Sequence, residues 1–194
     1  NRPGLVNARR ILWREVHNSD LRPEVDVSDW LQGHLLARCA GDAVAFLTSC
    51  DIRRYKRVEA AVGDAHAVAV ATVGLSNAER VGHRLDLPLV DWGTINVALK
   101  VDSGLTEAAF LELMSIATQA RTAAVMDLDL SLSVGRATGT GTDCVAVAAL
   151  PGSIPYAGLH TEIGEAAGRA VYAAVLEGAR DWMAGIGARI GVKT

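Results

Sequence analysis

The chain has 194 residues, of which half are hydrophobic and only 5% are aromatic, and its formal net charge is −3. This length suits a single domain with a continuous core, and the composition excludes an intrinsically disordered chain. The sequence contains neither an apolar run long enough to span a bilayer nor an extended basic run, so we expect no membrane and no nucleic acid among its partners.

Apolar runs, alternating or continuous, predict strands that are short and follow one another closely. They cover Ile11–Val16, Asp42–Thr48, Val58–Val62, Ala67–Val73, Thr94–Val101 and Asp143–Leu150. Helical periodicity predicts three helices, each preceded by a serine or threonine suited to cap it. They are 29–38 after Ser28, 107–126 after Thr106, and 162–183 after Thr161.

Helices and strands alternate only in the last third of the chain, whereas the strands before it come in runs. This order favours an α+β fold over a doubly wound sheet. We therefore expect one domain, 1–194, with a single layered sheet and two long helices packed on it.

A glycine- and threonine-rich segment, Ala137–Asp143, comes directly before the last predicted strand. Its glycines let the backbone approach a ligand closely, and the hydroxyls of Thr138, Thr140 and Thr142 can donate or accept hydrogen bonds. The segment lacks the lysine of a phosphate-binding loop, and a strand rather than a helix follows it. An ordinary glycine-rich turn into a strand explains the same residues.

A loop with a histidine leads into the last predicted helix, at Tyr156–Glu162. His160 lies just before the predicted N-cap Thr161, where backbone N–H groups can hold a developing oxyanion. Histidine titrates near neutral pH, which makes His160 the general-base candidate among the five histidines. Tyr156 in the same loop is a candidate ligand-binding residue. A capping or surface role for His160 is the alternative.

Polar residues at the ends of other predicted strands are further candidates for binding a ligand. They are Thr48, Asp51, Asn77, Thr94 and Asn96. Each of them also fits ordinary turn chemistry.

The cysteines Cys39, Cys50 and Cys144 show no CxxC spacing, and the histidines form no HxH or HExxH motif. We therefore expect no disulfide framework and no protein-bound metal, with reduced thiols in a cytoplasmic protein. The residues alone leave a hydrolase and a ligand-binding module both open.

Two blocks near the end of the sequence, Ala137–Val147 (ATGTGTDCVAV) and Tyr156–Val171 (YAGLHTEIGEAAGRAV), resemble the signature pair of the adenosylcobinamide amidohydrolase family. Further blocks in the same order as in that family are LTSCD at 47–51, ATVGLSN at 71–77, GTINV at 93–97 and TQARTAA at 118–124. The resemblance extends over roughly 13–182, nearly the whole chain.

The resemblance implies hydrolysis of the amide that joins the aminopropanol arm to the corrin ring of adenosylcobinamide. The product would be adenosylcobyric acid, in a salvage route for cobalamin. Cobalt would arrive inside the corrinoid substrate, so we expect no separate cofactor. The partner is then a corrinoid small molecule, and a homo-oligomer stays open. The alternative is a non-catalytic corrinoid-binding or carrier protein.

The catalytic roles follow from chemistry rather than from the resemblance. We expect His160, oriented by Asp143, to activate a water molecule, and Asn96, Thr140 and Thr142 to stabilise the oxyanion. An acyl-enzyme through Thr142 or Ser49 is the alternative mechanism. These residues should then line one cavity.

Overall fold

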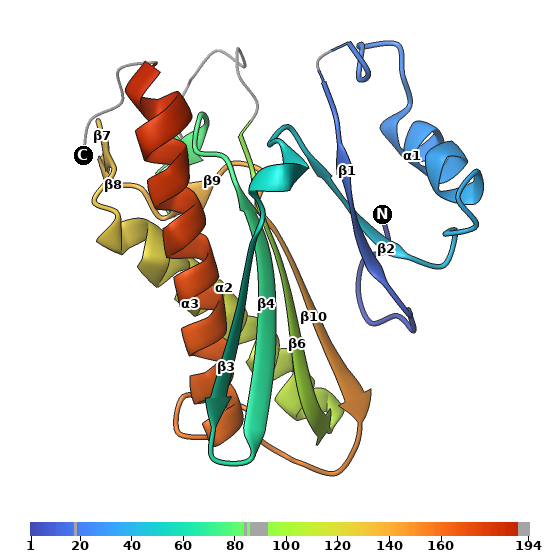
Figure 1. Cartoon of the computed structure of the whole chain (residues 1–194), viewed down its shortest axis with the longest axis vertical. Coiled ribbons are helices and arrows are strands. Elements are labelled where there is room, and N and C mark those ends of the chain that lie inside the picture. Colours follow the sequence, from blue (N-terminus) through green and yellow to red (C-terminus); the bar gives the residue numbers. More distant parts are fainter. Residues whose placement is uncertain (18, 84, 86–92, 190–194) are drawn as a thin grey trace.

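The computed structural model describes residues 1–17, 19–83, 85 and 93–189. Its centre is a four-stranded sheet in the order β10-β6-β4-β3 (Figure 1). The strands are β3 (Lys56–Val62), β4 (Ala65–Val73), β6 (Ile95–Leu105) and β10 (Cys144–Pro151). Strand β10 pairs with β6 in parallel, while β4 runs antiparallel to both β6 and β3.

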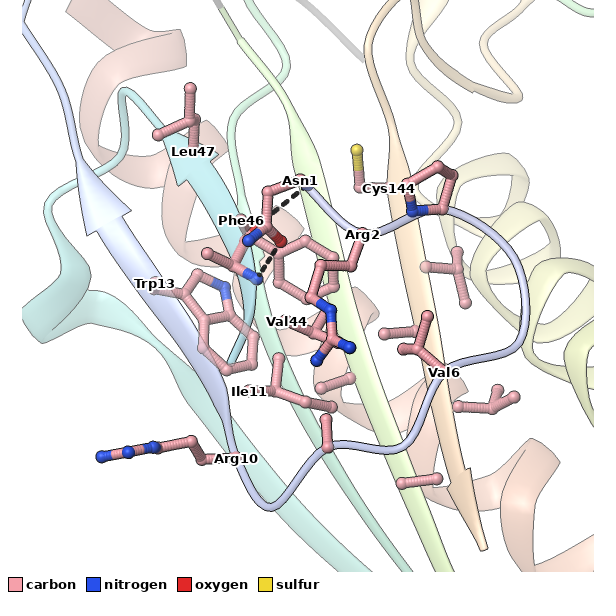
Figure 2. A pocket seen from close by; sticks show the side chains of 18 of the residues that line it. Asn1, Arg2, Val6, Arg10, Ile11, Trp13, Val44, Phe46, Leu47 and Cys144 are labelled. Carbon is pink, nitrogen blue, oxygen red and sulfur yellow. Dashed lines mark hydrogen bonds between the residues drawn. The ribbon is translucent and has the colours of Figure 1, made fainter. Parts of the chain in front are cut away.

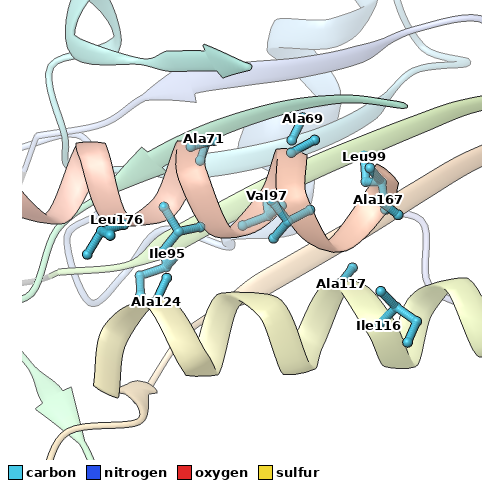
Figure 3. Packing of buried hydrophobic residues seen from close by; sticks show 14 of the residues in the cluster. Ala69, Ala71, Ile95, Val97, Leu99, Ile116, Ala117, Ala124, Ala167 and Leu176 are labelled. Atoms are coloured by element: carbon cyan, nitrogen blue, oxygen red, sulfur yellow. The ribbon is translucent and has the colours of Figure 1, made fainter. Parts of the chain in front are cut away.

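Two helices of 21 residues each, α2 (Glu107–Asp127) and α3 (Glu162–Trp182), cover one face of this sheet (Figure 1). Period-two alternation along the strands directs every second side chain toward them. The inward set is fully buried at Ala67, Ala69, Ala71, Ile95, Val97 and Leu99 (Figure 3). Many of the facing helix residues are alanines, which lets helix and sheet pack closely. No helix of the described residues packs directly on the opposite face of the sheet, called here the open face.

The amino-terminal part forms a separate β-α-β unit of β1 (Ile11–Glu15), α1 (Val27–Leu36) and β2 (Val44–Thr48). The two strands pair in parallel, with Trp13 opposite Phe46. A second, smaller hydrophobic cluster lies between these strands and α1 and includes Leu31 and Leu35.

Ser28 does not cap α1, in contrast to the sequence-based prediction. The N-cap is Asp26, whose carboxylate accepts hydrogen bonds from the backbone N–H groups of Ser28 and Asp29. A carboxylate at this position also interacts favourably with the helix dipole. The predicted caps Thr106 and Thr161 are confirmed, each accepting from a backbone N–H three residues later.

The remaining elements are short. A 3-10 turn, η1 (Ile52–Arg54), follows β2, and a π-helical turn, η2 (Met183–Gly187), follows α3. Two-residue strands form the pairs β5 (Ala78–Glu79) with β9 (Gly139–Thr140), and β7 (Ser131–Leu132) with β8 (Gly135–Arg136). No helix in the described part of the chain has the length and apolar character needed to cross a membrane. The expected α+β class is confirmed.

Strand direction gives the main sheet two distinct ends. Helix α2 is the crossover between the parallel strands β6 and β10, so both strands begin at the same end. The upper end, as drawn in Figure 1, holds Ile95 and Cys144, the first residues of those strands. The lower end holds their last residues, Leu105 and Pro151.

Replacement of Thr161 tests its role as the cap of α3. Thr161→Ala removes the hydroxyl that accepts from the Gly164 N–H at 2.9 Å. We expect the free energy of unfolding to fall by about 1 kcal/mol in urea denaturation. Thr118→Ala is the control, since Thr118 is exposed in the middle of α2 and should change stability by less than about 0.5 kcal/mol. Equal losses in both variants would contradict the cap assignment.

Candidate active site

A large groove lies between the open face of the main sheet and the β1–β2 pair (Figure 2). Its volume is about 2440 Å³. The first ten residues of the chain form a further wall, and residues of α1 and of the preceding loop, such as Val25 and Leu31, extend the lining. The groove therefore joins the two packed parts of the molecule.

The middle of the groove is mostly apolar, while the charged residues Lys100, Asp102 and Glu107 line it toward the lower end. Trp13 and Phe46 contribute an edge-to-face aromatic pair from β1 and β2, with ring centroids 5.2 Å apart. Small residues of the open face lie across from them, among them Ala98 and Ala146, which are opposite each other on β6 and β10. Alanine side chains leave this part of the sheet flat.

The upper end of the groove is polar. Thr48, Thr94, Thr142 and Cys144 line it together with Ser49 and Gly93. The Thr94 hydroxyl donates to the Thr142 carbonyl at 2.8 Å, and the Thr142 hydroxyl donates to the Gly93 carbonyl at 3.0 Å. These two bonds join the glycine- and threonine-rich segment to the start of β6. Each hydroxyl oxygen keeps a lone pair that can accept from a ligand.

Asp143 anchors this segment from behind. Its carboxylate accepts from Arg121 at 2.7 Å, from the Ile95 backbone N–H at 3.1 Å, and from both the backbone N–H and the hydroxyl of Thr140. The side chains of Arg121 and Asp143 are only 14% and 9% exposed. Because these donors occupy the carboxylate, Asp143 acts as a structural anchor and is poorly placed to take a proton or to orient a distant histidine.

Gly139 is required for this ion pair. A Cβ atom at this position would lie 2.0 Å from Arg121 Nη1 and 2.4 Å from Asp143 Oδ2. Both atoms belong to a buried, hydrogen-bonded pair and cannot move aside freely. The glycine thus serves close packing around the anchor.

Asn96 connects the main sheet to the β-α-β unit. It is fully buried and donates through Nδ2 to the Leu47 carbonyl at 2.7 Å. Its Oδ1 atom and the Oγ1 atom of the cross-strand residue Thr72 have no hydrogen-bond partner among the described residues. Thr48, 1% exposed, accepts from the Cys50 N–H at 3.1 Å. Asn96 therefore fixes the upper end without lining the groove.

The structure brings most of the other predicted residues to the upper end, although behind the groove wall. Thr140 pairs with Ala78 across β5 and β9, and Gly141 donates to the carbonyl of Asn77. Thr138 accepts from the Val81 N–H at 2.8 Å. These contacts are structural, and none of the three predicted residues lines the groove.

Asp51 also lies outside the groove lining and caps η1. Hydrogen bonds from the Arg53 guanidinium and backbone N–H lower the pKa of Asp51 to about 2. Its carboxylate is thus committed to a local ion pair at the surface.

His160 and Tyr156 lie at the lower end. The N-terminal turn of α3 contacts the β3–β4 hairpin there, with Glu162 accepting from the Asp64 N–H at 3.3 Å. Asn96 pairs with Thr72 at the opposite end of β4, so the length of that strand, about 23 Å, separates the two places. The expectation that His160 shares a cavity with Asn96 is therefore wrong. A catalytic role for His160 stays a prediction that this geometry does not support.

Among the groove residues that the sequence did not predict as site residues, His17 and Cys144 carry chemically reactive groups. All five histidines lie in the described residues, and only His17 lines the groove. Its signal in the sequence was its place directly after the predicted strand Ile11–Val16. Cys144 also lines the groove, and Figure 2 shows its side chain at the upper end. Desolvation raises the pKa of the Cys144 thiol, so the thiol is protonated at neutral pH and is a poor nucleophile.

Removal of the Arg121 charge, which pairs with Asp143, should destabilise the folded protein. Arg121→Met leaves the buried Asp143 carboxylate without its ionic partner, and we expect the free energy of unfolding to fall by about 3 kcal/mol in urea denaturation. The control is Arg169→Met, which breaks an exposed pair with Glu165 and should cost at most about 1 kcal/mol. A loss no larger than that of the control would show that the ion pair is not a structural anchor.

Among the described residues, no group of three or more His, Cys, Asp or Glu side chains is placed to hold a metal ion.

Comparison with known proteins gives one match. No curated protein and no solved structure matches the chain. A family model described as adenosylcobinamide amidohydrolase matches residues 1–186. By this match over nearly its whole length, the chain belongs to the adenosylcobinamide amidohydrolase family.

Proposed function

We propose that the protein hydrolyses the amide between the aminopropanol arm and the corrin ring of adenosylcobinamide. The products are adenosylcobyric acid and aminopropanol, and the reaction serves cobalamin salvage. Family membership supports the reaction class, and the groove is the observation in the structure that carries the proposal.

The size of the groove supports a substrate larger than a common metabolite. Pockets for drug-sized ligands have volumes of roughly 300–1,000 Å³, whereas this groove measures about 2440 Å³. A corrinoid combines a broad macrocycle with a rim of amide groups. Its size and its mixed polarity match a wide apolar groove with a polar end.

The distribution of polarity suggests how the substrate lies. The macrocycle packs against the flat alanine surface at Ala98 and Ala146, with the Trp13–Phe46 pair on the other side. The aminopropanol amide then reaches the upper end, where Thr94 and Thr142 can accept its N–H.

Direct attack by water fits this end better than an acyl-enzyme through Thr142 or Cys144. Water adds its oxygen to the carbonyl carbon, the C–N bond breaks, and a proton passes to the departing amine. The Thr142 hydroxyl already donates to the Gly93 carbonyl, and no base contacts it among the described residues. The thiol of Cys144 is protonated. Neither group is an activated nucleophile.

Mass spectrometry of adenosylcobinamide incubated with the protein tests the reaction. We expect adenosylcobyric acid and free aminopropanol to appear in equal amounts and in proportion to enzyme. Corrinoid that binds but is recovered unchanged would contradict the proposal and favour a binding or carrier protein.

Filling the groove tests where the corrinoid binds. Ala146→Trp places an indole on its flat wall and should weaken cobinamide binding at least tenfold by calorimetry. The control is Ala61→Trp, which adds the same side chain to an exposed position of the open face outside the groove. Unchanged affinity in a folded Ala146→Trp variant would place the binding site elsewhere.

A further inference from the structure

We propose that His17, oriented by Asp20, is the general base that activates the attacking water at the upper end of the groove. This inference rests on the proposed amide hydrolysis. It assigns the base to the upper end of the groove, whereas His160 lies outside the groove lining.

The position of His17 follows from the strand before it. The Val16 N–H donates to the Thr48 carbonyl at 2.9 Å, which extends the pairing of β1 and β2 to their carboxyl ends. His17 comes next in the chain and lines the groove together with Thr48. Thr94 and Thr142 line the same polar end from the segments just before β6 and β10. The histidine therefore lies where the β1–β2 pair ends, on the wall of the groove that Thr94 and Thr142 also line.

Two carboxylates flank the imidazole. Nδ1 lies 3.5 Å from Asp20 Oδ2, and Nε2 lies 3.7 Å from Glu15 Oε1. Both distances exceed those of closed hydrogen bonds, so both ring nitrogens keep their capacity to exchange a proton. The His17 side chain is 73% exposed, which gives it access to water in the groove.

Asp20 is itself held in place. Its carboxylate accepts from the His17 backbone N–H at 2.8 Å, and the backbone N–H of Asp20 donates to the His17 carbonyl at 2.8 Å. The first of these bonds is the main reason that the pKa of Asp20 is lowered, so the carboxylate is ionised at neutral pH. This negative charge, 3.5 Å from Nδ1, stabilises the imidazolium that forms when Nε2 takes a proton, and it orients the ring once the contact closes to a hydrogen bond in the substrate complex.

The proton balance needs no further reactant. Nε2 removes a proton from water as the oxygen bonds to the carbonyl carbon, and a tetrahedral intermediate forms. Collapse of this intermediate breaks the C–N bond, and the imidazolium returns the proton to the departing nitrogen. The products are a carboxylic acid, which ionises to the solvent, and an amine.

Other candidates at the upper end are less suited to this step. The Asp143 carboxylate is occupied by its four hydrogen bonds, and the Cys144 thiol is protonated. Histidine is the side chain whose ordinary pKa lies nearest to neutrality. His17 combines that chemistry with a place on the groove wall.

The test compares His17→Gln with His83→Gln, a change at an exposed histidine outside the groove. Turnover is measured as adenosylcobyric acid formed, and affinity as cobinamide binding by calorimetry. We expect His17→Gln to lower kcat by roughly 10²–10⁴-fold with Kd changed less than threefold. His83→Gln should leave both values unchanged. Asp20→Asn should lower kcat with little effect on Kd, as expected for a positioning residue.

A folded His17→Gln protein with wild-type kcat would overturn the assignment, while an active wild-type enzyme would leave the proposed function intact. Equal losses of kcat and affinity together with a lower Tm would also overturn it, because they indicate a structural role. A wild-type protein that binds cobinamide without releasing aminopropanol would overturn the proposed function, and the assignment of His17 with it.

Discussion

The buried ion pair between Asp143 and Arg121 determines the geometry of the upper end of the groove. One carboxylate joins α2, the first residue of β6 and the glycine- and threonine-rich segment before β10. Gly139 leaves the space that this pair needs. With the segment fixed from behind, the hydroxyls of Thr94 and Thr142 form a rigid polar wall. The most unusual stretch of the sequence therefore shapes the site chiefly through its packing.

The sequence predicted helices and strands correctly where the spacing of apolar side chains reflects which of them are buried. The predicted helices 107–126 and 162–183 agree with α2 and α3 to within a residue, because each has a capping threonine and a long apolar stripe. The two-residue strands β5, β7, β8 and β9 were not predicted, since two residues carry no periodicity. The cap of α1 was assigned two residues late, because Asp26 and Ser28 are both good caps and only the backbone decides between them.

The site was predicted only in part, and the reason is strand direction. Thr48, Thr94 and Thr142 do lie together on the groove wall. His160 follows Asp143 by only 17 positions, but the eight residues of β10 lie between them and carry the chain about 25 Å to the other end of the sheet. His17 belongs to no recognisable sequence motif. Its position on the groove wall depends on the pairing of β1 with β2, which joins residues distant in sequence.

We propose that the corrin ring binds in the groove between the two packed parts, with the aminopropanol amide at the upper end. A crystal structure with bound cobinamide tests this most directly. We predict the ring between Trp13 and the alanine surface of β6 and β10, and the amide carbonyl carbon within about 5 Å of His17 Nε2 with room for one water. A ring bound at the lower end, with the amide beside Tyr156 and His160, would contradict the account.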